Sequence, residues 1–165
     1  MFLCLNCNTL VESSKASQIV QRGSIGCACR FKTEKLLGCW LRDQFGEDAV
    51  SFQPPACRNP LTGRPTRFDF LVYDTVYIEL DGDIGHFGVG WNGKPDEDAP
   101  RRDLLKETWA LEHGRRVIRL LQRDVWAANH DWGAFLTEAI RMMLDASTSL
   151  VLCQNVSEYE GGVYA

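Results

Sequence analysis

Three acidic residues lie on two stretches whose apolar and polar side chains alternate, a pattern typical of β-strands. Asp69 lies within the apolar run 68–72, and Glu79 and Asp81 lie near the end of the run 76–81. Successive strand residues face opposite sides, so these carboxylates point away from the apolar face. Carboxylates held close together repel one another, and a divalent cation is the usual reason to tolerate that. One or two Mg²⁺ ions there would activate water and neutralise charge on a phosphodiester.

The turn between the two strands decides whether these carboxylates meet. Directly paired residues of a hairpin share a face, so a loop with an odd number of residues, such as Tyr73–Thr75, places Asp69 beside Glu79 or Asp81. A two-residue loop would place Asp69 beside Leu80 instead. The alternative for the whole group is a polar, solvated sheet face, although Glu-x-Asp in the centre of a strand is disfavoured by strand propensity.

Other residues that could do chemistry follow the acidic group along the chain. Asp103 begins the next expected helix, and Lys106 lies one turn later. We favour a functional role for His86, because it follows directly on the acidic strand; a plain surface histidine is the alternative. Trp91 lies in the Gly-rich segment 84–100, where it could stack on a nucleic-acid base or hold the loop onto the protein.

Four cysteines near the N-terminus have a spacing that suggests zinc. Cys4 and Cys7 form a C-x2-C pair, and Cys27 and Cys29 form a C-x-C pair nineteen residues further on. Two such thiolate pairs can close one tetrahedral site, and the metal would supply the folding free energy that a short polar segment lacks. Four free or buried thiols are the alternative. The total of seven cysteines is odd, which argues against a complete disulfide framework and favours an intracellular protein.

The composition is typical of one globular domain with at most a small appendage. The 165 residues are 45% hydrophobic and 24% charged, which excludes disorder and coiled coil. No apolar run approaches the roughly 20 residues of a membrane span, and no secretory signal is expected. The net charge of −4 is unusual for a nucleic-acid-binding protein, but residues 1–35 are basic and residues 69–103 are acidic. Charge alone does not separate a metal site beside a phosphate-binding rim from an ordinary acidic surface.

The elements that must position these residues are expected in the order α-β-β-β-α-β-α. A helix begins at Thr33 as N-cap and ends at Gly46, with Glu34 on the same stripe as Leu37 and Leu41. A short strand over 49–53 and a Pro- and Gly-rich loop follow.

After the two acidic strands, the pattern predicts a second helix, a strand and a third helix. The second helix runs from Arg101 to Gly114, and the strand covers 117–121. Asp131 caps the third helix, whose apolar residues recur at helical spacing. The residues after Ala146 are expected to form a trailing tail.

Several of these segments together resemble a known superfamily. They are Arg67-Phe-Asp69-Phe, Ile78-Glu79-Leu-Asp81-Gly82 with His86-Phe87, Arg102-Asp103-x-x-Lys106, and Gly114 with Val117-Ile-Arg119. They are similar to the PD-(D/E)XK restriction-endonuclease-like superfamily, in the branch of the very-short-patch-repair and EDxHD homing endonucleases. The likeness covers about Thr33 to Trp126.

This resemblance implies an α/β fold: an αβββαβ core whose mixed central sheet is flanked by helices. We therefore expect three parts. Residues 1–32 form a small zinc-binding module, residues 33–147 form the nuclease domain, and residues 148–165 form a C-terminal tail. A cysteine module ahead of such a nuclease is a familiar arrangement.

The family's functional residues carry over one by one. Glu34 matches the glutamate of the first helix, Asp69 the metal-binding aspartate, and Glu79 and Asp81 the second acidic pair. Asp103 matches the last acidic position of the family motif.

The chain departs from the family pattern at two places. His86 matches the histidine that acts on the water or the leaving group, but one extra residue separates it from Asp81. The superfamily lysine two residues beyond Glu79 is replaced by Asp81, and Lys106 or His86 is the candidate to take over its electrostatic role.

The implied activity is that of a hydrolase: a DNA endonuclease of homing or repair type. It uses Mg²⁺ or Mn²⁺ to activate water against the phosphodiester, with structural Zn²⁺ in the N-terminal module. Arg67, Trp91, Arg101 and Arg102 are expected to contact the nucleic acid. The alternatives are a structure-specific nuclease for branched DNA or RNA, and an inactive nucleic-acid-binding module of the same fold. The oligomeric state stays open, with a homodimer as one option, and no membrane partner is expected.

Overall fold

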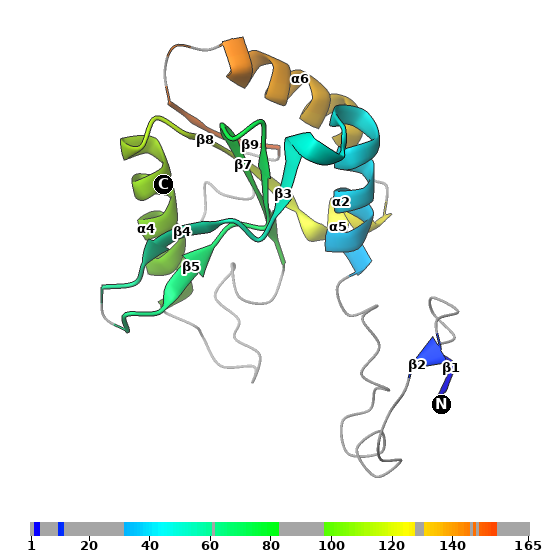
Figure 1. Ribbon diagram of the computed structural model, residues 1–165, viewed down its shortest axis with the longest axis horizontal. Coiled ribbons are helices and arrows are strands. Elements are labelled where there is room, and N and C mark those ends of the chain that lie inside the picture. The colour runs from blue at the N-terminus through cyan, green and yellow to red at the C-terminus, as the bar shows by residue number, and fades with distance from the viewer. Residues whose placement is uncertain are drawn as a thin grey trace.

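The computed structural model describes residues 2–3, 10–11, 32–60, 62–82, 98–127, 131–145, 147 and 149–154. Its centre is a five-stranded mixed sheet in the order β3-β6-β7-β8-β9 (Figure 1). β3 (Val50–Phe52), β6 (Phe70–Val72) and β7 (Val76–Asp81) pair antiparallel. β8 (Arg116–Leu121) and β9 (Val151–Cys153) continue the sheet in parallel. The expected mixed α/β architecture, a mixed sheet flanked by helices, is confirmed.

The hairpin between β6 and β7 has a three-residue loop. Val72 pairs with Val76 and Phe70 pairs with Ile78, which leaves Tyr73–Thr75 as the turn. The Thr75 N–H closes this turn on the carbonyl of Val72 at 3.0 Å. Because the loop is odd, the register carried one step further places Asp69 opposite Glu79. The predicted three-residue loop, which places Asp69 and Glu79 on the same face, is therefore present.

One face of the sheet carries the larger apolar core. Helices α2 (Lys32–Phe45), α5 (Gln122–Ala127) and α6 (Trp132–Asp145) cover this face. Its fully buried side chains come from both layers and include Leu37, Leu41, Ile78, Ile118 and Ile140. Burial of side chains of this size stabilises the fold by about 1.5–3 kcal/mol each.

The opposite face is covered by α4 (Asp98–Glu112) and is apolar only in part. Tyr77 and Val117 pack there against Ala110 of the helix. Along α4, the buried positions Asp103, Lys106 and Glu107 precede Ala110 on the same stripe. The half of this layer near the start of α4 is therefore built from charged residues.

The ends of the helices follow local signals. Gly46 has φ of +95°, and its N–H donates to the carbonyl of Arg42 at 2.8 Å, so it ends α2 as expected. The 3-10 turn Glu47–Ala49 leads from there into β3. Asp131 accepts a hydrogen bond from the Ala134 N–H at 2.9 Å and caps α6. The N-cap expectation for Thr33 is wrong, because α2 begins one residue earlier at Lys32.

Three segments differ from the expectations. The Pro- and Gly-rich segment contains a two-stranded hairpin of β4 (Pro55–Arg58) and β5 (Pro65–Arg67), because an unshared ribbon edge tolerates proline. The chain after Leu121 forms α5, and the region expected to be a tail supplies β9, an edge strand too short to be recognised by alternation. The boundaries at 32 and 147 stay predictions.

The N-terminal region is described only in β1 (Phe2–Leu3) and β2 (Leu10–Val11), which pair antiparallel. The four cysteines expected to bind zinc lie outside the described residues, as do His86 and Trp91. None of the helices in the described ranges combines the length and apolar character needed to cross a membrane.

Candidate functional site

Asp69 and Glu79 lie side by side on the face of the sheet that α4 covers. Asp69 directly precedes β6 and is half-buried, whereas Glu79 on β7 is only 6% exposed. The Leu80 N–H donates to Oδ2 of Asp69 at 2.7 Å. This bond links the Asp69 carboxylate to the neighbouring strand and fixes it beside Glu79.

Lys106 of α4 reaches down to this pair of carboxylates. Its Nζ forms a short ion pair with Oε1 of Glu79 and lies 3.4 Å from Oδ1 of Asp103. The ammonium also lies 5.2 Å from the centroid of the Phe68 ring, within the range of a cation–π contact. Oε2 of Glu79 is buried and accepts no hydrogen bond from the described residues. Among the described residues, Oε2 of Glu79 is thus a buried oxygen that could still accept a hydrogen bond or bind a cation.

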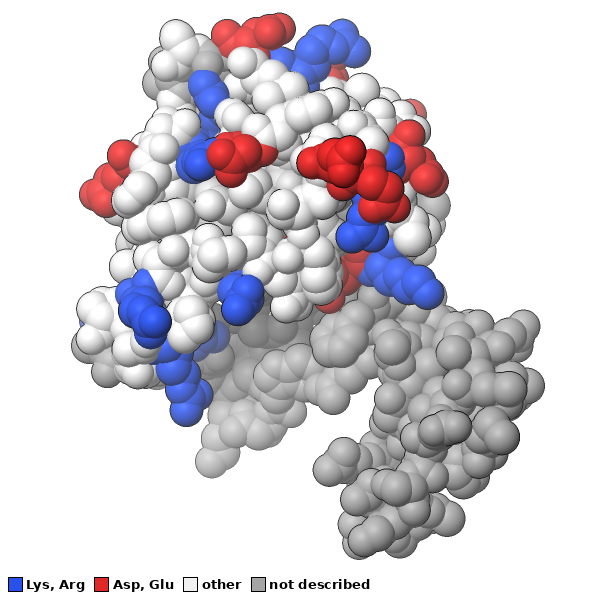
Figure 2. All heavy atoms as spheres, viewed as in Figure 1, with Lys and Arg blue, Asp and Glu red and all other residues white. Residues whose placement is uncertain are grey.

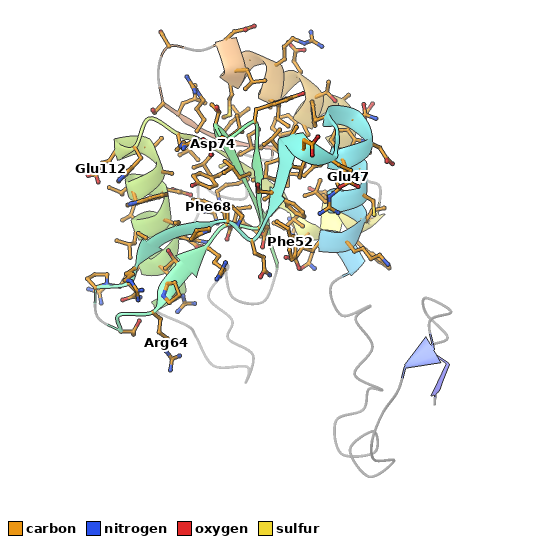
Figure 3. All side chains as sticks on the ribbon, viewed as in Figure 1. Glu47, Phe52, Arg64, Phe68, Asp74 and Glu112 are labelled. Carbon is orange, nitrogen blue, oxygen red and sulfur yellow. The ribbon has the colours of Figure 1, made fainter. Side chains whose placement is uncertain are left out.

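Phe68 reaches this position because the chain bends between β5 and β6. Alternation along the apolar run 68–72 would place Phe68 on the same face as Phe70, but the two side chains lie on opposite faces of the sheet. Phe68 (labelled in Figure 3) stacks on Tyr77 with ring centroids 4.2 Å apart, on the α4 side of the sheet. Phe70 belongs to the opposite core. The alternation of β6 extends back to Asp69 but, because of the bend there, not to Phe68.

A second charged cluster is centred on Arg119 of β8, whose side chain is fully buried. Its guanidinium donates to both oxygens of Asp81, at 2.6 and 2.5 Å. It also contacts Oε1 of Glu107 at 2.5 Å and Oδ2 of Asp103 at 3.2 Å. Such a planar, multidentate arrangement is characteristic of arginine. Arg119 neutralises carboxylates from β7 and α4 together.

This arrangement separates the three acidic residues that the sequence analysis grouped as one magnesium site. Asp81 is two residues from Glu79 on the same face, but Arg119 occupies both of its oxygens. Within the described ranges, no three His, Cys, Asp or Glu side chains form a group that could hold a metal ion. The structure therefore brings together Asp69, Glu79 and Lys106, and places Asp81 and Asp103 with Arg119.

Negative charge exceeds positive charge across the two clusters. The carboxylates are Asp69, Glu79, Asp81, Asp103 and Glu107, and the cations are Lys106 and Arg119. Burial, followed by the charges of Glu79 and Glu34, raises the pKa of Asp69 to about 8. Burial also raises the pKa of Glu79 and of Glu107, against the opposing effects of Lys106 and Arg119. The site would gain a proton or a cation more readily than an ordinary carboxylate pair.

The surrounding carboxylates also raise the pKa of Lys106. Burial alone would lower the pKa of its ammonium, but the carboxylates of Glu79 and Asp103 outweigh burial, so the pKa is raised. Lys106 therefore remains a charged hydrogen-bond donor throughout the physiological pH range.

Gln53 links Asp69, at the centre of the site, to Glu34 and Arg67 at its rim. Its backbone N–H donates to the carbonyl of Asp69 at 2.8 Å, and its side chain donates to Oε1 of Glu34 at 3.4 Å. Its own carbonyl accepts a hydrogen bond from Arg67 at 2.7 Å. Glu34 of α2 and Arg67 of β5, both expected at the site, are thus held at its rim. Arg101 and Arg102 lie exposed on α4.

Sequence reasoning assigned no role to Gln53 or Glu107, and it included Arg119 only as part of a motif. A signal existed for Arg119, because a charge inside the apolar strand 116–121 must be paired when the strand is buried. Glu107 lies one helical turn after Asp103, so it shares the inward stripe. Gln53 has no comparable signal, since its role comes from main-chain bonds and a φ of +46°.

The fold and the site define the class of this protein: a mixed α/β domain with a buried carboxylate–lysine site between one helix and the sheet. No family model, no curated protein and no solved structure matches the chain.

Proposed function

We propose that this protein is a metal-dependent endonuclease that hydrolyses phosphodiester bonds in DNA, on a restriction-endonuclease-like fold. The observation that carries the proposal is the side-by-side placement of Asp69 and Glu79, with Lys106 bound to Glu79. Two carboxylates and one ammonium on rigid elements are a chemically sufficient set for positioning a cation and a phosphate.

The arrangement of the elements supports the same proposal. The helix α2, strands β3, β6 and β7, helix α4 and strand β8 follow one another as αβββαβ, with the β4–β5 hairpin inserted. Glu79 lies on β7, Asp69 lies directly before β6, and the lysine lies on the helix that crosses to the parallel strand β8. This order is the one that the resemblance of Thr33–Trp126 implies.

The residues present fit a divalent cation. Mg²⁺ in proteins is often bound by only one or two carboxylates, with waters and substrate phosphates completing the shell. Asp69 and Glu79 provide that number, and the unbonded, buried Oε2 of Glu79 is an oxygen without another partner among the described residues. Held by these two side chains, Mg²⁺ or Mn²⁺ would offset the excess negative charge and lower the pKa of water.

Lys106 is proposed to take the place of the superfamily lysine. The strand position two residues after Glu79 holds Asp81, which pairs with Arg119, whereas the ammonium of Lys106 arrives at Glu79 from α4. Because it stays protonated, Lys106 would donate a hydrogen bond to a phosphate oxygen and stabilise the charge that develops there. Asp103 holds this ammonium from one turn away.

Glu34 is the residue proposed to orient the attacking water and accept its proton. It is half-buried, is held by Gln53, and lies close enough to Asp69 for its charge to raise the pKa of that carboxyl. His86 stays the candidate for protonating the leaving group, and Cys4, Cys7, Cys27 and Cys29 stay the candidates for Zn²⁺.

The test is cleavage of supercoiled plasmid, branched DNA and RNA with Mg²⁺ or Mn²⁺, against EDTA. Wild type is compared with Asp69→Asn and with the control Asp43→Asn, which changes an exposed aspartate of α2. Lys106→Met is compared with Lys35→Met in the same way, after circular dichroism has established that each variant is folded. We expect metal-dependent product that is lost only in the two site variants.

Each other outcome has a defined meaning. Cleavage that persists in folded Asp69→Asn would refute the proposed site. Preferential cleavage of branched DNA or RNA would make the protein a structure-specific nuclease. Wild type that binds nucleic acid but cuts no substrate would be an inactive binding module.

A further inference from the structure

The β4–β5 hairpin is a preformed ribbon at the edge of the site. Pro55 pairs with Arg67 and Arg58 with Pro65, and the Asn59 N–H closes the loop on the carbonyl of Arg64 at 2.9 Å. The Gly63 N–H donates to the carbonyl of Asn59 at 2.8 Å, with Gly63 at φ +66°. Main-chain bonds therefore fix the shape of the ribbon before any partner binds.

The hairpin is attached to the helix that carries the site lysine. Cys57 of β4 lies with its Sγ 3.1 Å from Oγ1 of Thr66 and 4.0 Å from the carbonyl of Leu105 in α4. The Nζ of Lys106 lies 3.5 Å from the carbonyl of Arg67 at the end of β5. The ribbon and the candidate site are thus parts of one packed unit, and their relative position is set by α4.

The charge of the hairpin is opposite to that of the whole chain. Residues 54–68 contain three arginines and no acidic residue, whereas the chain has a net charge of −4. Arg58, Arg64 and Arg67 are exposed, and Arg64 projects away from the protein at the end of the ribbon (Figure 3). Over β4 and β5, Figure 2 shows blue side chains and no red ones, while red gathers over other parts of this face.

The dimensions and the charge select one kind of partner. The major groove of B-form DNA, about 12 Å wide, admits a two-stranded β-ribbon, whereas the major groove of A-form RNA is too narrow for side chains to read. Arginines on such a ribbon would contact the phosphates on either side of the groove. Arg67 lies two residues before Asp69, so DNA held by the ribbon would continue toward the two carboxylates.

We propose that the β4–β5 hairpin docks in the major groove of double-stranded DNA, with Arg58 and Arg64 contacting the backbone. The choice of DNA as partner rests on the proposed function, but binding by the hairpin does not require cleavage. The observation that carries the docking proposal is the position of the hairpin: it contains arginines and no acidic residue, and its contacts with α4 hold it beside Asp69 and Glu79.

Fluorescence anisotropy with a labelled DNA duplex of about 30 base pairs tests this docking in EDTA, where no metal-dependent cleavage occurs. The full chain carrying Arg58→Gln and Arg64→Gln is compared with a chain carrying Lys35→Gln and Arg141→Gln. This control removes the same charge from exposed positions of α2 and α6. Dissociation constants are measured between about 50 and 200 mM salt.

We expect the hairpin variant to bind roughly tenfold more weakly and to lose about one to two units of the salt-dependence slope. The control variant should bind like wild type. Arg58 also donates to the carbonyl of Gly63 at 2.9 Å, so Arg64→Glu serves as a second variant. Arg64 contributes main-chain bonds to the hairpin, and these survive the substitution.

Equal affinity of the hairpin and control variants for duplex DNA would overturn the docking proposal, as would wild-type binding of duplex RNA as tight as that of duplex DNA. Failure of the nuclease proposal appears differently. In that case the hairpin variants lose DNA binding as expected, but wild type with Mg²⁺ cuts nothing.

Discussion

Asp69→Asn should stabilise the metal-free protein, and more so as the pH rises. Burial and the charges of Glu79 and Glu34 raise the pKa of the Asp69 carboxyl to about 8, from a reference value of 3.8. Between these two values the folded protein holds a proton that the unfolded chain has released. The free energy of unfolding therefore falls with rising pH across this window, and the loss is complete above pH 8. Asparagine removes the titrating group, while its Oδ1 can still accept the Leu80 N–H.

The size of the effect follows from the same shift. Each pH unit within the window costs the wild type at most about 1.4 kcal/mol, which sets a ceiling of several kcal/mol. Relaxation and water penetration reduce such penalties, and Asp69 keeps some exposure to solvent. We therefore expect Asp69→Asn to gain on the order of 2 kcal/mol at pH 8, or about 4–8 °C in Tm.

Thermal unfolding in EDTA at a series of pH values from 5 to 8 measures this difference. The control is Asp43→Asn, because Asp43 is exposed on α2 and its replacement should leave the pH dependence of wild type unchanged. A difference in Tm between Asp69→Asn and wild type that stays flat over this range would refute the reasoning. A variant less stable than wild type at pH 8 would refute it as well, because Asp69 would then contribute favourably to folding.

The remaining predictions concern the metal, the buried network and the backbone. Mg²⁺ should raise the Tm of wild type more at pH 8 than at pH 6, because it competes with the proton on Asp69. It should leave the Tm of Asp69→Asn unchanged, and differential scanning fluorimetry measures the Tm of both proteins. Arg119→Met should lower the free energy of unfolding by about 3–5 kcal/mol in denaturant titrations, since it leaves Asp81, Asp103 and Glu107 without their shared partner. The control Arg141→Met, at an exposed site, should change it by no more than about 0.5 kcal/mol. Gly46→Ala should cost about 1–3 kcal/mol through its backbone of φ 95° and ψ 150° alone, since its Cβ meets no atom within 4 Å. Gly38→Ala should cost about 1–3 kcal/mol because its Cβ would lie 3.0 Å from Cε1 of Phe70, and both costs are read from urea midpoints. Asp131→Ala should cost about 1 kcal/mol by removing the cap of α6, and Asp131→Asn should recover most of it in the same urea titrations.

Much of the scaffold could be predicted from local sequence signals. The helical spacing of Leu37 and Leu41, the terminating Gly46 and the cap at Asp131 each act within one or two helical turns, so no knowledge of the fold was needed. The same holds for the pairing of Asp69 with Glu79. It depends only on strand alternation and on the length of one tight turn.

The partners of the charged residues could not be predicted in this way. Asp81 and Glu79 share one strand face, and sequence periodicity gives them the same role. The tertiary structure divides them: Arg119 comes from the adjacent parallel strand to bind Asp81, and Lys106 comes from α4 to bind Glu79. The bend that turns Phe68 under α4 and the insertion of an arginine hairpin also depend on contacts between distant segments.

The sequence by itself thus determined the order of the core elements from α2 to β8, without the inserted hairpin, together with the acidic pair and the residue types available for chemistry, because these follow from short-range periodicity and turn length. The tertiary structure alone decided which carboxylate is neutralised and which keeps an unbonded oxygen. That choice depends on which cation lies within a few ångströms, and the two cations, Lys106 and Arg119, follow the end of the acidic strand by 25 residues or more along the chain.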